Sequence, residues 1–265
     1  MKKILFSIMY RIMRWLCRIA TPVLDLEGTE NLPEENVILV GNHAQMFGPI
    51  GLNLYPPRSQ YTWCTSEMMH LKEVPAYAYK DFWSDKPKYI QWFFHLASYL
   101  IAPFSVVCFN TAPTIPVYKD QRVFTTFDLT VQHLMADCDV VIFPEGKTPR
   151  NNIINEFQIG FLNVARKYYK KCGKPLTLVP MYLSPELKKI IFGKPIVFNP
   201  DSPPPEERRR VNEELMNAVT ELAASQPLHT VIPYTNMAKK DYPKNLPVIK
   251  KEIRKEAEHL RNGQK

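Results

Sequence analysis

The chain has 265 residues, 45% of them hydrophobic, and carries 34 Lys and Arg against 26 Asp and Glu. This apolar content can bury a core of ordinary size, which excludes a largely disordered chain. The net charge of +8 favours a polyanionic partner, either nucleic acid or an anionic membrane surface. The nine glycines form neither a GxGxxG nor a GxxxxGK[ST] pattern, so the usual backbone loops for dinucleotides and nucleoside triphosphates are absent.

Residues 1–21 are predicted to form an amphipathic helix that associates with a membrane. Basic and polar residues recur at steps of three or four on one stripe of this helix, and the other faces are apolar. The stripe comprises Lys3, Ser7, Arg11, Arg14 and Arg18. Such helices lie among lipid headgroups with their cations directed at phosphates, whereas a spanning helix or a secretory signal would not carry these arginines. The alternative is a helix docked on the protein's own core.

A second apolar run, residues 90–109, is about as long as a bilayer span. Polar residues and Pro103 interrupt it, which favours a buried or half-immersed hairpin of helices over a segment that crosses the bilayer. Tyrosines and tryptophans precede the run, and their rings suit a membrane–water interface because one end is apolar and the other polar.

The cysteines are few, odd in number and far apart, without a CxxC pair. They are Cys17, Cys64, Cys108, Cys138 and Cys172. This pattern indicates reduced thiols in a cytosolic compartment and no metal site.

Residues 22–200 are predicted to form a single α/β domain with a mainly parallel central sheet covered by helices, because short β-branched runs alternate with helical patterns. The expected strands are residues 37–40, 115–118, 140–143 and 176–183. Helical stripes cover residues 124–134 and 157–168, and residues 188–198 read as a late β-hairpin split at Gly193. Residues 201–265 are expected to add C-terminal helices at 206–224 and 246–260.

Two segments that follow predicted strands carry groups suited to chemistry. His43 leaves the carboxyl end of the first strand, where α/β folds place reactive groups, although a lone histidine is more often structural. The second segment, residues 143–150, contains Lys147 and Arg150, which could hold a phosphate together with backbone N–H groups. Its alternative is an ordinary strand exit with solvated charges.

Four ordered blocks of the chain resemble the glycerolphospholipid acyltransferase family, which includes the PlsC-type lysophosphatidate acyltransferases. Asn42-His43 resembles the NHxxxxD block of that family, residues 115–119 its second block, residues 143–146 its FPEG block, and Val179-Pro180 its fourth. The resemblance runs from about residue 22 to 200. Four blocks in the right order are far more specific than any one of them.

The resemblance implies acyl transfer from acyl-CoA or acyl carrier protein to a hydroxyl of a lysophospholipid or a glycerol-phosphate-like acceptor, with no bound cofactor or metal. His43 would be the general base that takes the proton of the acceptor hydroxyl. The implied substrate-binding residues are Asn42, Lys119, Arg122, Glu145, Gly146, Lys147, Thr148 and Arg150. The implied pocket residues are Phe143, Pro144, Val179 and Pro180. The expected location is the cytoplasmic face of the cell membrane, on an anionic surface.

The chain departs from the family pattern at the aspartate that falls five residues after the histidine, because Gly48 occupies that position. Such a carboxylate fixes the tautomer of the imidazole and stabilises its cation, and its loss costs about 10⁴-fold in the Ser-His-Asp triad of serine proteases. Thr148 stands where the arginine after FPEG is usual, and Arg150 lies slightly further on.

Two hypotheses follow from this departure. Either Glu67, Asp120 or an ordered water supports His43 in an active acyltransferase, or the chain is a catalytically impaired relative that binds lipid or acyl carrier at the membrane. Nucleic-acid binding is disfavoured because no recognised motif accompanies the basic charge. Hydrolysis through a serine is disfavoured because no GxSxG motif is present.

Overall fold

The computed structural model describes residues 2–84, 86–235 and 237–246. The chain forms two compact units: the first comprises Met1–Pro22 and Leu52–Val141, and the second Val23–Gly51 and Ile142–Lys265. Because each unit takes two separate stretches of chain, the units do not coincide with the three consecutive segments expected from the sequence. Those segment boundaries stay a prediction.

The first unit contains three parallel strands. Strand β3 (Gln60–Thr65) lies between β5 (Asp139–Ile142) and β4 (Thr114–Val117). Helix α5 (Val123–Leu134) packs against β4 and buries Phe127, Val131 and Leu134 of the apolar stripe expected of it, whereas Phe124 is 64% exposed. The two strands predicted in this unit agree with β4 and β5 to within one residue.

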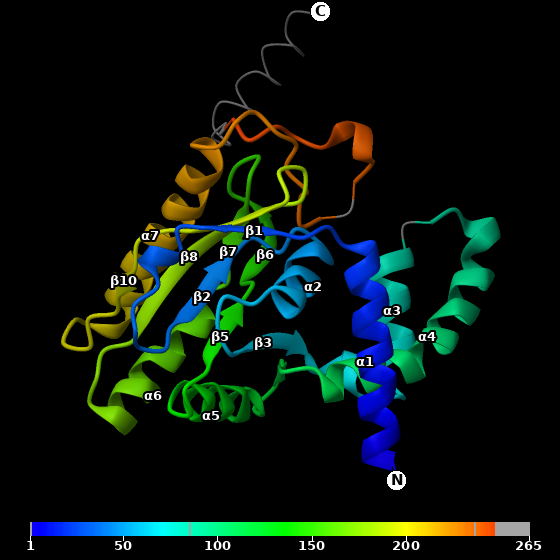
Figure 1. Cartoon of the computed structure of the whole chain (residues 1–265), viewed down its shortest axis with the longest axis horizontal. Helices are drawn as coiled ribbons and strands as arrows, with labels where there is room; N and C mark the ends of the chain where they lie inside the picture. The colour runs from blue at the N-terminus through cyan, green and yellow to red at the C-terminus, as the bar shows by residue number, and fades with distance from the viewer. Residues whose placement is uncertain (1, 85, 236, 247–265) are drawn as a thin grey trace, which may run out of the picture. The chain divides into compact units, whose positions relative to one another are not determined.

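Helix α4 (Gln91–Thr111) and the short helix α3 (Val74–Ala78) pack together in the first unit, and α1 (Lys2–Ala20) also contacts α4 (Figure 1). The π-helix Tyr79–Trp83 and the 3₁₀ turns Ser66–Met69 and Lys88–Ile90 connect these elements. The prediction of a hairpin within residues 90–109 was wrong. The run is one continuous helix: it contains no glycine, and Pro103, which lies on the exposed side of the helix, does not interrupt it.

Six large apolar side chains of α4 point outward, whereas small residues pack inward together with the partly buried Ile101, Val106 and Phe109. Ser98, Ala102 and Ser105 are buried, while the large side chains on the opposite face are 53–69% exposed. Those exposed side chains are Trp92, Phe93, Leu96, Tyr99, Leu100 and Phe104. Among the described residues, the stretch Lys88–Thr111 is the one helix long and apolar enough to cross a membrane, judged by length and composition alone.

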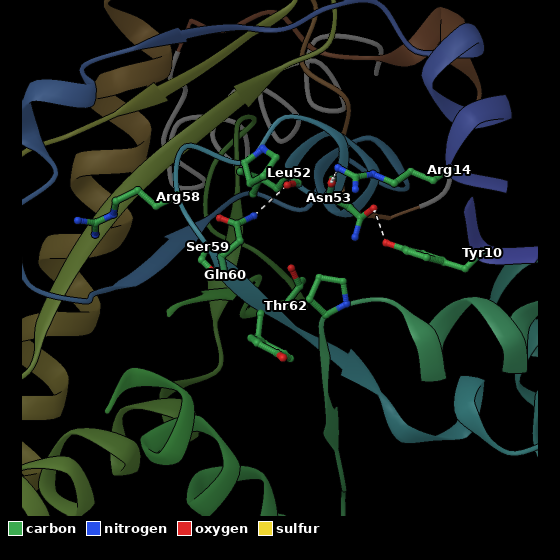
Figure 2. Close-up of a pocket in the computed structure, with 11 residues that line it drawn as sticks. Tyr10, Arg14, Leu52, Asn53, Arg58, Ser59, Gln60 and Thr62 are labelled. Atoms are coloured by element: carbon green, nitrogen blue, oxygen red, sulfur yellow. Dashed lines mark hydrogen bonds between the residues drawn. The ribbon is translucent and has the colours of Figure 1, made fainter. Parts of the chain in front are cut away.

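Helix α1 also exposes its apolar face, and its polar side contacts the first unit. Tyr10 donates a hydrogen bond to the side chain of Asn53 at 3.1 Å, and Arg14 donates to the Asn53 carbonyl at 3.1 Å, as Figure 2 shows. The Arg18 guanidinium lies 5.9 Å from the centre of the Tyr55 ring. Part of the basic stripe therefore holds the helix in place, while the apolar residues stay outside. These exposed residues are Ile4, Leu5, Phe6, Ile8, Ile12, Trp15, Leu16 and Ile19.

The second unit contains a mixed sheet with the strand order β1-β9-β8-β2. Strand β2 (Ile38–Gly41) is parallel to β8 (Thr177–Ser184), and β1 (Asp25–Glu27) is parallel to β9 (Lys189–Phe192). Helix α7 (Pro204–Ala224) packs against β8, and α6 (Asn163–Cys172) completes the unit (Figure 1). The predicted α/β class with mainly parallel strands and surrounding helices is confirmed.

The hairpin expected within residues 188–198 was wrong. Both β9 and β10 (Ile196–Val197) pair antiparallel with β8, so they are two parts of one interrupted strand. The interruption faces Pro180, which has no N–H to donate to a ladder, while the N–H of Gly193 donates to the Pro180 carbonyl at 2.8 Å. The chain reverses instead between β8 and β9, where Lys188 has φ of 56°.

The helix expected over residues 157–168 begins later than predicted. Phe157 ends strand β7 (Asn155–Phe157), which pairs antiparallel with β6 (Glu145–Pro149), and Phe161 lies in the 3₁₀ turn Ile159–Leu162. Tertiary hydrogen bonding overrides the apolar periodicity here, because the N–H of Gln158 donates to the Pro144 carbonyl. The helix predicted at 206–224 is present as α7, whereas the one predicted at 246–260 lies almost wholly outside the described residues.

Candidate active site

His43 follows directly on strand β2 of the second unit, at its carboxyl end. The preceding Asn42 is 2% exposed; its side chain donates to the Leu183 carbonyl at 3.0 Å and accepts from the Leu183 N–H at 2.8 Å. Asn42 thereby extends the pairing of β2 with β8 by one side chain. The predicted contact of Asn42 with a substrate would require this pairing to open.

A buried carboxyl group holds the backbone of His43. One oxygen of Glu145 accepts the His43 N–H at 2.7 Å, and the other accepts the Asn155 N–H at 2.9 Å. Glu145 is 3% exposed. Burial raises its pKa to about 7, although the two backbone N–H groups act in the opposite direction. The first and third sequence blocks therefore meet through this side chain.

The loop after His43 has an unusual backbone. Ala44 and Gln45 have φ of 44° and 54°, the left-handed region that costs residues with a Cβ on the order of 1–3 kcal/mol each. Helix α2 (Phe47–Leu54) follows at once. Gly48 itself does not have a positive φ, because the described glycines in that region are Gly28 and Gly173.

Two aromatic rings pack edge-on against the imidazole of His43. The Phe143 ring centre lies 5.2 Å away, and the Tyr234 ring centre 5.7 Å away. Phe143 belongs to the FPEG block, as predicted, but Tyr234 lies in a segment without a recognisable motif. A Cβ on Gly48 would come within 3.1 and 3.2 Å of the Phe143 ring. Phe143 thus occupies space next to the position where the family pattern has an aspartate.

The remaining residues predicted in the second unit have different surroundings. Lys147 and Thr148 are exposed on β6, and the Gly146 carbonyl accepts a hydrogen bond from the Asn155 side chain at 2.7 Å. Arg150 contacts helix α7, donating to Glu213 at 2.6 Å and to Asn217 at 2.9 Å. The predicted binding of a phosphate by Arg150 would therefore compete with α7.

The predicted pocket residues other than Phe143 are buried. Pro144 lies just before β6, and Val179 and Pro180 lie within β8, paired in register with Leu39 and Val40 of β2. Their part in an acyl channel stays a prediction.

Lys119 and Arg122 belong to the first unit, where both have carboxylate partners. Lys119 contacts Glu67 at 2.7 Å, and Arg122 contacts Asp120 at 2.8 Å. Hydrogen bonding to Lys119 and Thr65 lowers the pKa of Glu67, although its partial burial opposes this. The two carboxylates suggested as substitutes for the motif aspartate are thus engaged by cations. A shared anion site of Lys119, Lys147 and Arg150 stays a prediction.

The cavity shown in Figure 2 has a volume of about 300 Å³ and lies in the first unit. Tyr10, Asn53, Gln60 and Pro113 contribute to its lining, and none of the predicted site residues lines it. Among the described residues, no group of three or more His, Cys, Asp or Glu side chains is placed to hold a metal ion.

Replacing Glu145 with glutamine should change how stability depends on pH. The pKa of Glu145 is raised in the folded protein. Between about pH 4.5 and 7, Glu145 therefore binds a proton in the folded protein and loses it in the unfolded chain, so a rise in pH favours unfolding. The contribution of Glu145 to the free energy of unfolding should fall by up to about 1.4 kcal/mol per pH unit in this range and level off above pH 7. Urea unfolding of the wild type and Glu145→Gln across this range measures it, with Glu221→Gln on α7 as the control. A constant difference between wild type and Glu145→Gln would contradict the assignment.

Substitution of Gly48 should destabilise the loop whether the new residue is alanine or aspartate. A Cβ at this position would lie 2.5 Å from the His43 carbonyl oxygen, a distance that forces the backbone to shift. We expect both Gly48→Ala and Gly48→Asp to lower the free energy of unfolding by about 1–3 kcal/mol. Gly160→Ala is the control, since nothing lies within 4 Å of its Cβ position. Equal stability of Gly48→Asp and the wild type would refute the steric argument.

The comparison with protein families agrees with the sequence blocks. Residues 23–184, more than half of the chain, match the family described as Acyltransferase. Among solved structures, the chain is similar to the 1-acyl-sn-glycerophosphate (LPA) acyltransferase PlsC from Thermotoga maritima, with 18% identity over 84% of this chain and 80% of that chain and a TM-score of 0.46. No curated protein sequence matches. The match over residues 23–184, with His43 and Glu145 joined inside it, shows that the chain belongs to the acyltransferase family.

Proposed function

We propose that the protein transfers a fatty acyl group from acyl-CoA or acyl carrier protein to a hydroxyl of a lysophospholipid or a glycerol-phosphate-like acceptor. Membership of the acyltransferase family supports acyl transfer in general. The observation that carries the more specific proposal is the bond between the His43 backbone and Glu145, because it joins the two most informative blocks around one half-exposed imidazole.

In the proposed mechanism, His43 takes the proton of the acceptor hydroxyl as its oxygen attacks the thioester carbonyl carbon. The new carbon–oxygen bond forms a tetrahedral adduct, which collapses when the carbon–sulfur bond breaks. The departing thiolate then takes the proton from the imidazolium, so the products are an ester and a free thiol. An imidazole suits both steps because its ordinary pKa lies near neutrality.

A specific observation favours the alternative of an impaired, lipid-binding family member. Phe143 lies beside the position of the missing carboxylate, and the two residues after His43 are left-handed. An aromatic ring and a strained turn thus stand where the family pattern has a carboxylate. Binding of an acyl chain or an acyl carrier would not need a basic imidazole.

Replacement of His43 with alanine tests the enzymatic proposal. We expect turnover of labelled acyl-CoA or acyl carrier protein with lysophosphatidate to fall by about 10²–10⁴-fold, the usual contribution of a general base. His70→Ala, a substitution of an exposed histidine, should keep the wild-type rate. Unchanged turnover in His43→Ala would exclude His43 as the base. No turnover by the wild type with donors of several chain lengths would favour the binding alternative.

We further propose that the exposed apolar faces of α1 and α4 bind the cytoplasmic surface of the cell membrane. Both helices expose large side chains in the same unit, and α4 packs through small residues as helices do in lipid. Arginines at positions 11, 14 and 18 are exposed beside this apolar face, which suits anionic headgroups.

Replacing Trp92, Leu96 and Leu100 with serine should strongly weaken binding to anionic vesicles, because it removes three of the six large exposed apolar side chains of α4. Flotation with vesicles of phosphatidylglycerol and phosphatidylcholine measures the bound fraction. Leu228→Ser and Val197→Ser are matched controls, since both residues are at least 50% exposed but belong to the second unit. Undiminished flotation of the triple variant would reject this membrane face.

A further inference from the structure

The segment that follows α7 folds back on itself, shown orange to red in Figure 1, and we refer to residues 229–235 and 237–245 as the strap. Its two ends pair with each other: the Val231 N–H donates to the Pro243 carbonyl at 2.8 Å, and the Asn245 N–H donates to the His229 carbonyl at 3.1 Å. Asn245 is 1% exposed, and its side chain also binds the His229 N–H and the Ala223 carbonyl. The base of the strap is therefore rigidly connected to the end of α7.

A buried histidine fixes the strap to strand β8. His229 is fully buried; its Nδ1 lies 2.8 Å from the Pro227 carbonyl and its Nε2 lies 2.7 Å from the Tyr182 hydroxyl. A carbonyl only accepts hydrogen bonds, so Nδ1 carries a proton and donates to Pro227, and Nε2 shares a hydrogen bond with the Tyr182 hydroxyl. Burial raises the pKa of Tyr182, which keeps its hydroxyl a neutral donor. The first residue of the strap is thus bound to β8, the strand that also binds the side chain of Asn42.

The far part of the strap reaches the loop around His43. The ring of Tyr234 packs edge-on with the imidazole, with ring centres 5.7 Å apart, and this contact adds to the one that Phe143 makes. The side-chain amide of Gln45 donates to the Tyr242 hydroxyl at 3.2 Å. Gln45 is one of the two left-handed residues, so the strap contacts both the candidate base and the strained turn beside it. Left-handed residues persist only where their surroundings determine them.

We propose that the strap orients the His43 imidazole in place of the missing aspartate, with Tyr234 as the positioning residue and Tyr242 acting through Gln45. The strap lies outside residues 23–184, the part of the chain that matches the family. Packing between two ring edges restricts rotation of the imidazole, which is one of the two tasks of the usual carboxylate. The inference rests on the proposed acyl transfer for its kinetic consequences, although not for its structural ones.

Tyr234→Leu and Tyr234→Phe separate positioning from general packing. In Tyr234→Leu we expect kcat to fall by about ten-fold or more with KM for the thioester almost unchanged, because misorientation of a base affects the chemical step. Tyr234→Phe keeps the ring edge and should retain most of the rate. Tyr169→Leu, a partly exposed tyrosine of α6, is the control and should leave kcat unchanged.

A second measurement does not depend on turnover. The rate at which diethyl pyrocarbonate modifies His43, followed by mass spectrometry of the peptide, should rise several-fold in Tyr234→Leu and in Gln45→Ala but not in Tyr234→Phe. This reactivity pattern in a protein that shows no acyl transfer would refute the proposed function and leave the strap proposal standing. Wild-type acyl transfer with unchanged kcat and unchanged His43 reactivity in Tyr234→Leu would overturn the strap proposal alone. If Tyr234→Leu fails to fold, Gln45→Ala carries the same two comparisons.

Discussion

The arrangement of the second unit depends on the hydrogen bond between the backbone N–H of His43 and the buried carboxyl of Glu145, which joins residues 102 positions apart. A buried carboxyl group is unfavourable unless its oxygens find donors, and here two backbone N–H groups supply them. Through Asn155 the same carboxyl group fixes the β6–β7 ribbon. Glu145 therefore determines where the FPEG segment lies relative to the candidate base, and it does so without an ion pair in the described contacts.

The sequence was sufficient to predict the α/β class and four strands, because short β-branched runs that alternate with helical patterns favour strands in a mainly parallel sheet. It also marked His43 and the FPEG segment as parts of the candidate site, and the structure joins them through Glu145. It could not show that Asn42 uses its amide to continue the sheet, or that Arg150 binds Glu213 on α7. Those partners lie 141 and 63 positions away, and nothing in the local pattern of either residue encodes them. Tyr234 could not be predicted for the same reason, since no periodicity or motif marks its segment.

Helix α4 illustrates a different limit of sequence reasoning. Its composition predicted an apolar segment, but the direction of its faces depends on which residues are small. Ser98, Ala102 and Ser105 let the helix approach its neighbours closely, with the Ser105 hydroxyl donating to the Met68 carbonyl at 3.0 Å. Six bulky side chains on the opposite face are left outside this contact. A helix of a water-soluble protein shows the opposite arrangement, so the proposed membrane surface follows from packing rather than from hydropathy.

The surroundings of His43 separate two roles that one aspartate normally combines. A carboxylate next to a histidine fixes the orientation of the ring and also compensates the positive charge that the ring gains in the reaction. Phe143 and Tyr234 can restrict orientation, because their ring edges pack against the imidazole. They carry no charge to offset the imidazolium. Aspartate cannot be restored simply at position 48, since its Cβ would displace the His43 carbonyl. On the proposed mechanism, these two rings therefore supply the geometric contribution of the missing aspartate to the transfer step and none of its electrostatic contribution.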